Sequence, residues 1–150
     1  METWPSGTAP GSGGTGGTWS HPWCAGPNSA IVRLLLGVQP IEAGWQRFQL
    51  APQPSSLKTI NATVPFVFGE TAAQVALEIA QTTTSLSVRF TVPAGTSAAV
   101  CLPPPHGADD DAGGGAVVTL DGKSVPTVAR GRMLCLVSDA VAGSHVVARA

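Results

Sequence analysis

The chain has 150 residues, enough to bury one core, and 11% of them are charged, for a formal net charge of -1. This balance excludes the strongly basic surface that nucleic acids or anionic membranes require. No apolar run approaches the roughly 20 residues of a membrane span. The first residues also lack the basic and apolar regions of a signal peptide, which makes the cytoplasm the default location.

Residues 1–18 are rich in Gly, Ser, Thr and Pro, and GTAPGSGGTGG predicts a flexible loop. It has no Lys-Ser/Thr ending and opens no helix, so it is not a phosphate-binding loop. The next stretch, GTWSHPWCAG, contains Trp19, His21, Trp23 and Cys24. Aromatic faces with a neighbouring hydrogen-bonding group make a candidate sugar pocket. The alternative is that His21 only caps or packs.

A short helix is expected in PNSAIVRLLLG. Asn28 or Ser29 can cap its start, residues 30–36 supply an apolar run, and Gly37 suits its end. The run is apolar on nearly all sides, so we expect it to be buried against something large. The segment VQPIEAGW is then expected to be a loop.

Strand patterns dominate after Trp45, in WQRFQLAP, LKTINATVPFVFG, SLSVRFTVP, TSAAVCLP, MLCLVSD and SHVVARA. Alternate residues from Leu86 to Val92 are apolar and predict a buried face. AAQVALEIAQT has a helix-forming composition, but its periodicity favours a strand. AVVTLDGKSVP predicts a hairpin that turns at Asp121-Gly122.

About seven to nine short strands with regular turn signals predict a mainly β fold. The expected architecture is an antiparallel β-sandwich preceded by a Gly-rich loop and one short helix. The chain accordingly divides into residues 1–44 and a sandwich of residues 45–150.

Three cysteines, Cys24, Cys101 and Cys135, are widely spaced and form no CxxC pair, so no zinc site is expected. We expect buried free thiols, and the alternative is one disulfide between Cys101 and Cys135. Asn61-Ala62-Thr63 matches an N-glycosylation acceptor, a tripeptide that is also common by chance.

His106 precedes a run of aspartates, residues 109–111, among prolines and glycines. Carboxylates favour hard cations, but this stretch lacks the spaced acceptors of a calcium loop, so we expect a solvated acidic loop. No metal and no cofactor are therefore expected. His145 begins a strand and is expected to be structural or at the surface. Ser144 is next to His145 in the sequence, but adjacency alone does not make a catalytic triad, and no GxSxG motif is present.

Several motifs resemble, in order, the C-terminal part of bacterial-type α-L-rhamnosidases of glycoside hydrolase family 78. They are ETW, the stretch GTWSHPWCAGPNSAIVRLLLGVQPIEAGWQRFQLAPQP, FTVPAGTSAAVCLP and AGSHVV. In that family the end of an (α/α)6 barrel carries a W-E-x-W-like segment, a glycine-rich loop and an S/N-H-x-W/Y segment, and a β-sandwich follows. The resemblance implies that residues 1–44 are a remnant of the catalytic barrel and that residues 45–150 are the C-terminal sandwich domain.

The family implies inverting hydrolysis of terminal α-L-rhamnosyl bonds, which needs a general acid and a general base roughly 6.5–9.5 Å apart. By resemblance, Glu2 matches the general base. The residues that the resemblance assigns to sugar binding are His21, Trp23, Trp4 and Trp19. Met1 and Pro5 depart from the Trp and Asp that the family has at these positions.

In the family, the general acid and most of the barrel lie upstream of the matched residues. We therefore expect a C-terminal fragment of an α-L-rhamnosidase that is inactive as an isolated chain, although the question of enzyme activity stays open. Its partners would be a rhamnose-containing glycan in the full enzyme and a catalytic barrel, on which helix 30–36 would dock.

One alternative is a stand-alone β-sandwich module that binds carbohydrate or a protein, and another is a purely structural module. The aromatic residues of the strands are expected to lie mostly in the core, which argues against a strong sugar-binding face. They are Trp45, Phe48, Phe66, Phe68 and Phe90.

Overall fold

The computed structural model describes residues 26–104 and 116–150, and the chain forms two compact units, residues 1–31 and 32–150. The first unit is described from Gly26, where helix α1 (Gly26–Ala30) begins. A π-helical turn, η2 (Ile31–Leu35), follows it. A short helix preceding the strands is thus confirmed.

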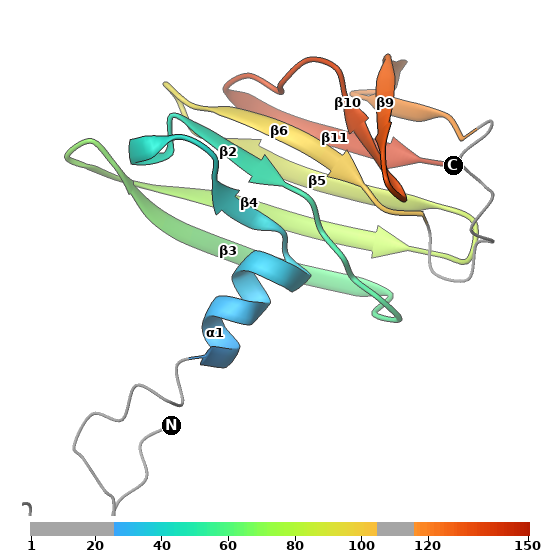
Figure 1. Ribbon diagram of the computed structural model, residues 1–150, viewed down its shortest axis with the longest axis horizontal. Helices are drawn as coiled ribbons and strands as arrows, with labels where there is room; N and C mark the ends of the chain where they lie inside the picture. Colours follow the sequence, from blue (N-terminus) through green and yellow to red (C-terminus); the bar gives the residue numbers. More distant parts are fainter. Residues whose placement is uncertain (1–25, 105–115) are drawn as a thin grey trace, which may run out of the picture. The chain divides into compact units, whose positions relative to one another are not determined.

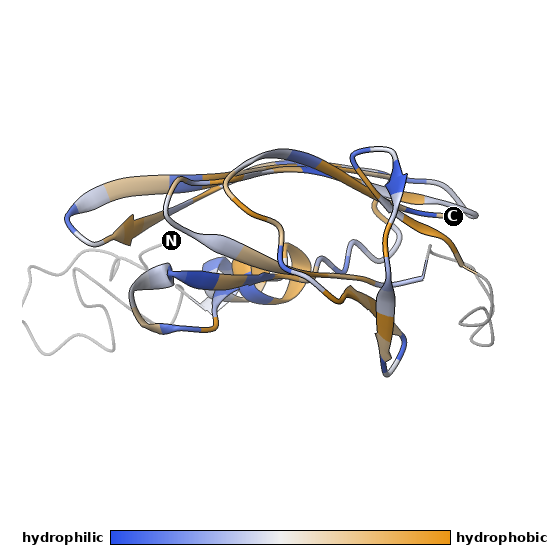
Figure 2. Cartoon of the chain, turned by 90° about the horizontal axis from the view of Figure 1, so that it is seen from above, coloured by the Kyte–Doolittle hydropathy of each residue, from blue (hydrophilic) through white to orange (hydrophobic). Residues whose placement is uncertain are grey.

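The second unit is built from strands (Figure 1). They are β1 (Val38–Pro40), β2 (Arg47–Leu50), β3 (Thr59–Phe68), β4 (Thr71–Gln81), β5 (Leu86–Val92), β6 (Ser97–Leu102), β7 (Val118–Leu120), β8 (Lys123–Ser124), β9 (Thr127–Arg130), β10 (Met133–Leu136) and β11 (Gly143–Arg149). A short 3-10 turn, η3 (Ala43–Trp45), precedes β2. The strands form a five-stranded sheet, β1-β2-β6-β10-β9, and a six-stranded sheet, β3-β4-β5-β11-β7-β8. Figure 2 shows the sheets as two layers, so the expected β-sandwich is confirmed.

The five-stranded sheet contains one parallel pair. β2 runs parallel to β6, with Arg47 opposite Ser97, while the other pairs of this sheet are antiparallel. Parallel neighbours need a long crossover. Here the meander β3-β4-β5, which belongs to the other sheet, supplies it.

Strand β4 shows tertiary packing overriding helix propensity. Val75, Leu77 and Ile79 are buried, and the residues between them lie on the outer face. Ten consecutive residues of β3 pair with β4, from Thr59 to Phe68. The predicted strand is confirmed because its apolar period of two matches a sheet with one buried face.

One hydrophobic core lies between the sheets, and the predicted buried face of β5 points into it. Leu86, Val88, Phe90 and Val92 are all at most 3% exposed. Phe48 and Leu50 of β2 are fully buried as well. The core thus takes alternate residues from both sheets, as expected for a sandwich.

The predicted hairpin at Asp121-Gly122 is also confirmed. Asp121 has a φ of 51° and Gly122 a φ of 77°. Two residues with positive φ between antiparallel strands β7 and β8 form the type I′ turn that Asp-Gly favours.

Two short edge strands were not expected from the sequence. β1 lies in the segment VQPIEAGW, which we interpreted as a loop, and β9 follows the β7–β8 hairpin. Each lies at an edge of the five-stranded sheet. Strands this short show no clear alternation, and Pro40 is tolerated in β1 because an edge strand needs fewer ladder hydrogen bonds.

The expectation of free thiols is wrong for two of the three cysteines. Cys101 of β6 and Cys135 of β10 lie directly opposite each other, with Cα atoms 3.9 Å apart, and form a disulfide. Sequence spacing could not show that these two strands are neighbours. Cys24 lies outside the described residues. Asn61 and Thr63 of the sequon are exposed on β3, an edge strand.

Candidate functional site

The residues that the family resemblance assigns to the site fall outside the described part of the chain. These are Glu2, Trp4, Trp19, His21 and Trp23. His106 and the acidic run 109–111 lie outside it too. Their roles stay predictions, and the described residues define the scaffold that follows them.

The helical turn η2 is joined to the sandwich through a tight backbone contact. The amide of Ala51 donates to the carbonyl of Gly37 (3.0 Å), and the amide of Gln53 donates to the carbonyl of Leu35 (2.9 Å). Leu36, directly after η2, is buried in the core, whereas Leu34 within η2 is 66% exposed. The C-terminal end of η2 is therefore anchored to the sandwich, while the turn itself presents apolar surface to solvent.

An aromatic cluster lies near the start of β2. Trp45 stacks on Phe66 of β3 with ring centroids 4.5 Å apart, and Phe48 lies 6.3 Å from Phe66. Phe48 and Phe66 are buried, and Trp45 is partly buried against the same core. These rings stabilise the sandwich interior, in line with the expected core location of the strand aromatics.

A bidentate ion pair connects β2 with the segment between β10 and β11. Nε of Arg47 lies 2.5 Å and Nη2 lies 3.0 Å from the carboxylate of Asp139, which also accepts from Ser97 Oγ at 3.3 Å. The hydrogen bond from Arg47 lowers the pKa of Asp139, and its charge adds to this effect against the cost of burial. The pair holds Asp139 as an anion.

We expect Asp139→Asn to lower the free energy of unfolding at pH 7 by about 1 kcal/mol, because it removes a charge-assisted, partly exposed pair. Since folding lowers the pKa of Asp139, this stabilisation is present above the ordinary pKa, 3.8, and is lost as the pH falls through the folded-state pKa. Urea unfolding at pH 7 and near pH 3 measures both effects. Glu78→Gln is the matched control, since the Glu78–Arg89 pair is exposed and 3.6 Å long. Equal losses in the two variants would contradict the prediction.

A second polar cluster surrounds His145 of β11. Its Nδ1 lies 2.8 Å from Oδ2 of Asp121 in the β7–β8 turn, and its Nε2 lies 2.8 Å from the carbonyl oxygen of Val141. The other oxygen of Asp121 accepts from the amide of Val146 at 2.8 Å. Asp121 lies 24 residues before His145, so no local sequence pattern could reveal this contact.

These contacts move both pKa values toward the charged forms. Burial opposes the charge on His145, but its bonds to Asp121 and to the carbonyl of Val141, with the charge of Asp121, together raise its pKa. The bond from His145 lowers the pKa of Asp121, and the amide of Val146 adds to this. His145 has a structural role, as expected, and its charge and that of Asp121 also stabilise each other.

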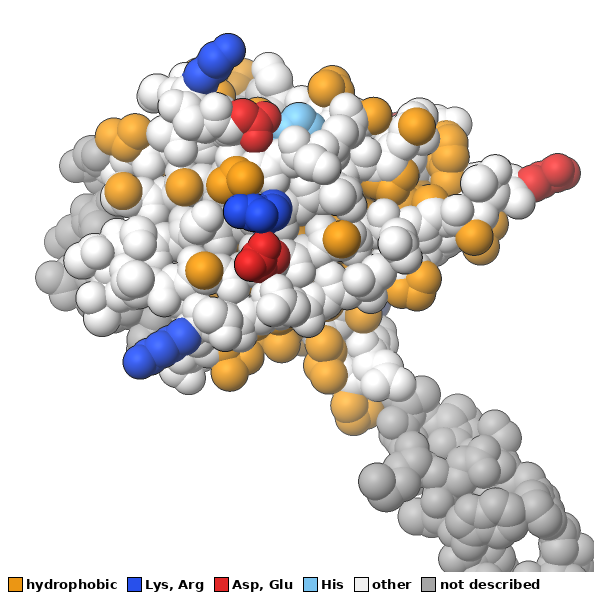
Figure 3. Space-filling model, turned by 180° about the vertical axis from the view of Figure 1, so that it is seen from behind, with side chains coloured by type: hydrophobic (Ala, Val, Ile, Leu, Met, Phe, Trp, Pro, Cys, Tyr) orange, Lys and Arg blue, Asp and Glu red, His pale blue; other side chains and the backbone are white. Residues whose placement is uncertain are grey.

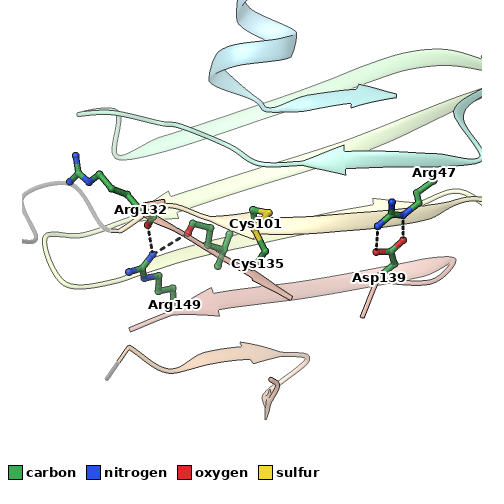
Figure 4. Close-up of a disulfide and its surroundings, with 7 residues drawn as sticks. Arg47, Cys101, Arg132, Cys135, Asp139 and Arg149 are labelled. Atoms are coloured by element: carbon green, nitrogen blue, oxygen red, sulfur yellow. Dashed lines mark hydrogen bonds and ion pairs between the residues drawn. A yellow bond between two sulfur atoms is a disulfide. The ribbon is translucent and has the colours of Figure 1, made fainter. Parts of the chain in front are cut away.

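The guanidinium of Arg149, 3% exposed, lies at the other end of β11. Its Nη1 donates to the carbonyls of Leu102 (3.1 Å) and Arg132 (3.3 Å). Burial lowers its pKa. Figure 4 shows the disulfide between this group and the Arg47–Asp139 pair. Arg149 therefore binds the C-terminal end of β6 at Leu102, and Asp139, which Arg47 holds, binds the other end at Ser97.

Charged side chains are few on the face of the molecule in Figure 3, and hydrophobic side chains are scattered between them. Within residues 26–104 and 116–150, no three His, Cys, Asp or Glu side chains are grouped to hold a metal ion. The same residues include no helix long and apolar enough to cross a membrane.

Comparison with known proteins gives a consistent result. The model of the family described as the bacterial alpha-L-rhamnosidase C-terminal domain matches residues 37–116, which is more than half of the chain. The chain is similar in fold to an alpha-L-rhamnosidase from Dictyoglumus thermophilum, with a TM-score of 0.65 and 19% identity over 82% of this chain and 13% of that one.

It is also similar in fold to the alpha-L-rhamnosidase of Streptomyces avermitilis that was crystallised with L-rhamnose. The TM-score is 0.57 and the identity 20%, over 79% of this chain and 10% of that one. The match thus spans 13% of one protein and 10% of the other. No curated protein matches it in sequence.

Proposed function

The chain belongs to the family of bacterial alpha-L-rhamnosidase C-terminal domains, and on this premise we propose that it is the C-terminal part of an α-L-rhamnosidase of glycoside hydrolase family 78. Residues 1–44 would be the end of the catalytic barrel and residues 45–150 the sandwich domain. Since β1 (Val38–Pro40) pairs with β2, the last part of the proposed barrel segment also contributes a strand to the sandwich. The observation that carries the proposal is the family match over residues 37–116.

In the full enzyme, the proposed reaction is inverting hydrolysis of terminal α-L-rhamnosides. Glu2 would activate the attacking water as general base, and His21, Trp23, Trp4 and Trp19 would contact the sugar. A general acid must protonate the leaving oxygen at the same time. The substrate would be a rhamnose-containing glycan or glycoside.

Two of the described carboxylates, Asp121 and Asp139, are unsuited to replace the general acid, which supports the proposal that this chain alone is inactive. A general acid needs a raised pKa so that it carries a proton near neutral pH. Asp121 and Asp139 have lowered pKa values because His145 and Arg47 bind them. Asp121 and Asp139 are therefore held as anions, which is the wrong protonation state for an acid catalyst.

The purified chain is expected to release no chromogenic aglycone from an aryl α-L-rhamnoside above the rate of buffer, because a base without its acid and barrel lacks the preorganised pair. Glu2→Gln is the matched control. Turnover by the wild-type chain that is lost in Glu2→Gln would overturn the proposed inactivity. Turnover that the Glu2→Gln variant retains would overturn both the inactivity and the role of Glu2 as general base.

The proposal that this chain is part of a longer α-L-rhamnosidase has a separate test, which is to read the coding sequence upstream of residue 1 in the transcript. An open frame that encodes barrel helices and a second carboxylate is expected. In-frame stop codons directly upstream would contradict the proposal and would favour a stand-alone module. The predicted docking helix of residues 30–36 corresponds in the structure to the end of α1 and to η2, and the exposure of Leu34 supports the proposal that this stretch docks on the barrel.

A further inference from the structure

The imidazole of His145 lies between two acceptors that cannot both be satisfied by a neutral ring. Oδ2 of Asp121 and the carbonyl oxygen of Val141 are each 2.8 Å from one ring nitrogen. A neutral imidazole carries one N–H, whereas an imidazolium donates from both nitrogens. The geometry therefore fits the protonated ring.

The two acceptors belong to different segments of the sandwich. The imidazole on β11 therefore links both segments to the same strand through its side chain. Asp121 is in the β7–β8 turn, and its own amide donates to the carbonyl of Val146 (2.8 Å). Val141 lies in the segment between β10 and β11, where the amide of Ala140 donates to Ala98 of β6 (2.8 Å). Protonated His145 fixes both segments to β11.

The charged side chains on the surrounding elements are Asp121, Lys123, Asp139, Arg89 and, farther along β11, Arg149. Asp121 is the one that bonds to the ring, and the charge of Lys123 acts on Asp121. Asp139 is bound by Arg47, and Arg89 lies beside Glu78 on the outer face. On β5 the ring of Phe90, 5.5 Å away, adds no charge. Of these charged groups, Asp121 is therefore the one that affects proton binding by the His145 imidazole.

We propose that His145 is a proton-dependent clamp, which holds residues 137–142 to β11 when protonated and releases the carbonyl of Val141 when it loses a proton. The remaining N–H stays on Nδ1, because the carboxylate of Asp121 is a stronger acceptor than a carbonyl. The β7–β8 turn therefore stays attached while the 137–142 segment loosens.

The sign of the pH dependence follows from linkage. In the released state the ring keeps its bond to Asp121 but loses its bond to the carbonyl of Val141, which helps to raise its pKa, so the pKa is lower in the released state than in the clamped state. The clamp is at full strength below the pKa of the released state and is lost as the pH rises through the pKa of the clamped state. The local opening equilibrium changes about tenfold for each pH unit between the two pKa values.

Amide hydrogen exchange, followed by NMR on the full chain between pH 5.5 and 8.5, tests the clamp. After correction for the intrinsic exchange rate, protection of the Ala140 amide is expected to fall with rising pH, while that of Val88 in the middle of β5 stays constant. The pH dependence of Ala140 protection should vanish in His145→Gln. It should persist in the control variant His106→Gln, which removes a different histidine. Protection of Ala140 that does not change with pH in the wild-type chain would overturn the proposal.

Titration of the imidazole nitrogens by 15N NMR provides a second readout that does not require a folded His145→Gln variant. The wild-type ring is expected to carry protons on both nitrogens up to a pKa above 6.5, and Asp121→Asn is expected to lower that pKa. Asparagine tolerates the positive φ at position 121, so the turn is retained. A wild-type pKa at or below 6.5 would overturn the clamp.

Discussion

Gly37→Ala is expected to lower the free energy of unfolding of the sandwich by about 2–5 kcal/mol, because it adds a steric clash to the left-handed backbone strain. The Cβ of an alanine at this position would lie 2.0 Å from the carbonyl oxygen and 2.1 Å from the carbonyl carbon of Ala51. Both are backbone atoms held by the hydrogen bond between Ala51 and Gly37. Relief would require the separation of η2 from the chain that follows β2.

Gly44→Ala separates this steric clash from the cost of backbone conformation. Both glycines have a φ of 67°, but a Cβ at Gly44 meets no atom within 4 Å. The control therefore carries the left-handed strain alone, about 1–2 kcal/mol. Guanidinium chloride unfolding of the wild-type chain and both variants measures the difference. Equal losses would show that the contact between Gly37 and Ala51 is looser than described.

Removal of the Cys101–Cys135 disulfide is expected to lower the free energy of unfolding by about 2–4 kcal/mol. The bond joins β6 to β10 across a sequence separation of 34, so it restricts a long segment in the unfolded chain. A domain of this size has a total stability of about 5–15 kcal/mol, which makes the loss a large fraction. The double variant Cys101→Ala with Cys135→Ala, unfolded in urea, measures it.

Thiol titration checks the pairing itself. The chain has three cysteines, so the unfolded, unreduced protein should show one free thiol and the reduced protein three. Cys24→Ala should remove the one free thiol and leave the stability gain of the disulfide intact. Three free thiols without reductant, or a disulfide that includes Cys24, would contradict the pairing.

The strands of the core were predictable because burial imposes a period of two on the sequence. Leu86 to Val92 and the residues of β4 show it, and the Asp121-Gly122 turn is specified by its own two residues. The contacts that tie the strands together were not predictable. Arg47 and Asp139 are 92 residues apart, and Cys101 and Cys135 are neighbours because of strand order rather than spacing.

The candidate site shows a different limit. Its residues were assigned from a family resemblance, and Glu2, His21 and Trp23 lie outside the described part of the chain. The coupling of His145 to Asp121 was missed for a physical reason, since a serine or histidine at a strand start carries no signal of its partner. A hairpin turn with an acidic residue, opposite the last strand, is the feature that would have drawn attention to it.

The parallel pairing of β2 with β6 affects how the chain folds while it is being synthesised. Residue 47 lies opposite residue 97, and the intervening meander completes the other sheet. During translation β2, with Phe48 and Leu50 that are buried in the folded domain, therefore leaves the ribosome long before β6 exists, and only the short strand β1 can pair with it at that stage. Non-local pairing of this kind is slow compared with the hairpins of the meander. Until β6 is made, the apolar side chains of β2 stay exposed and are prone to aggregation.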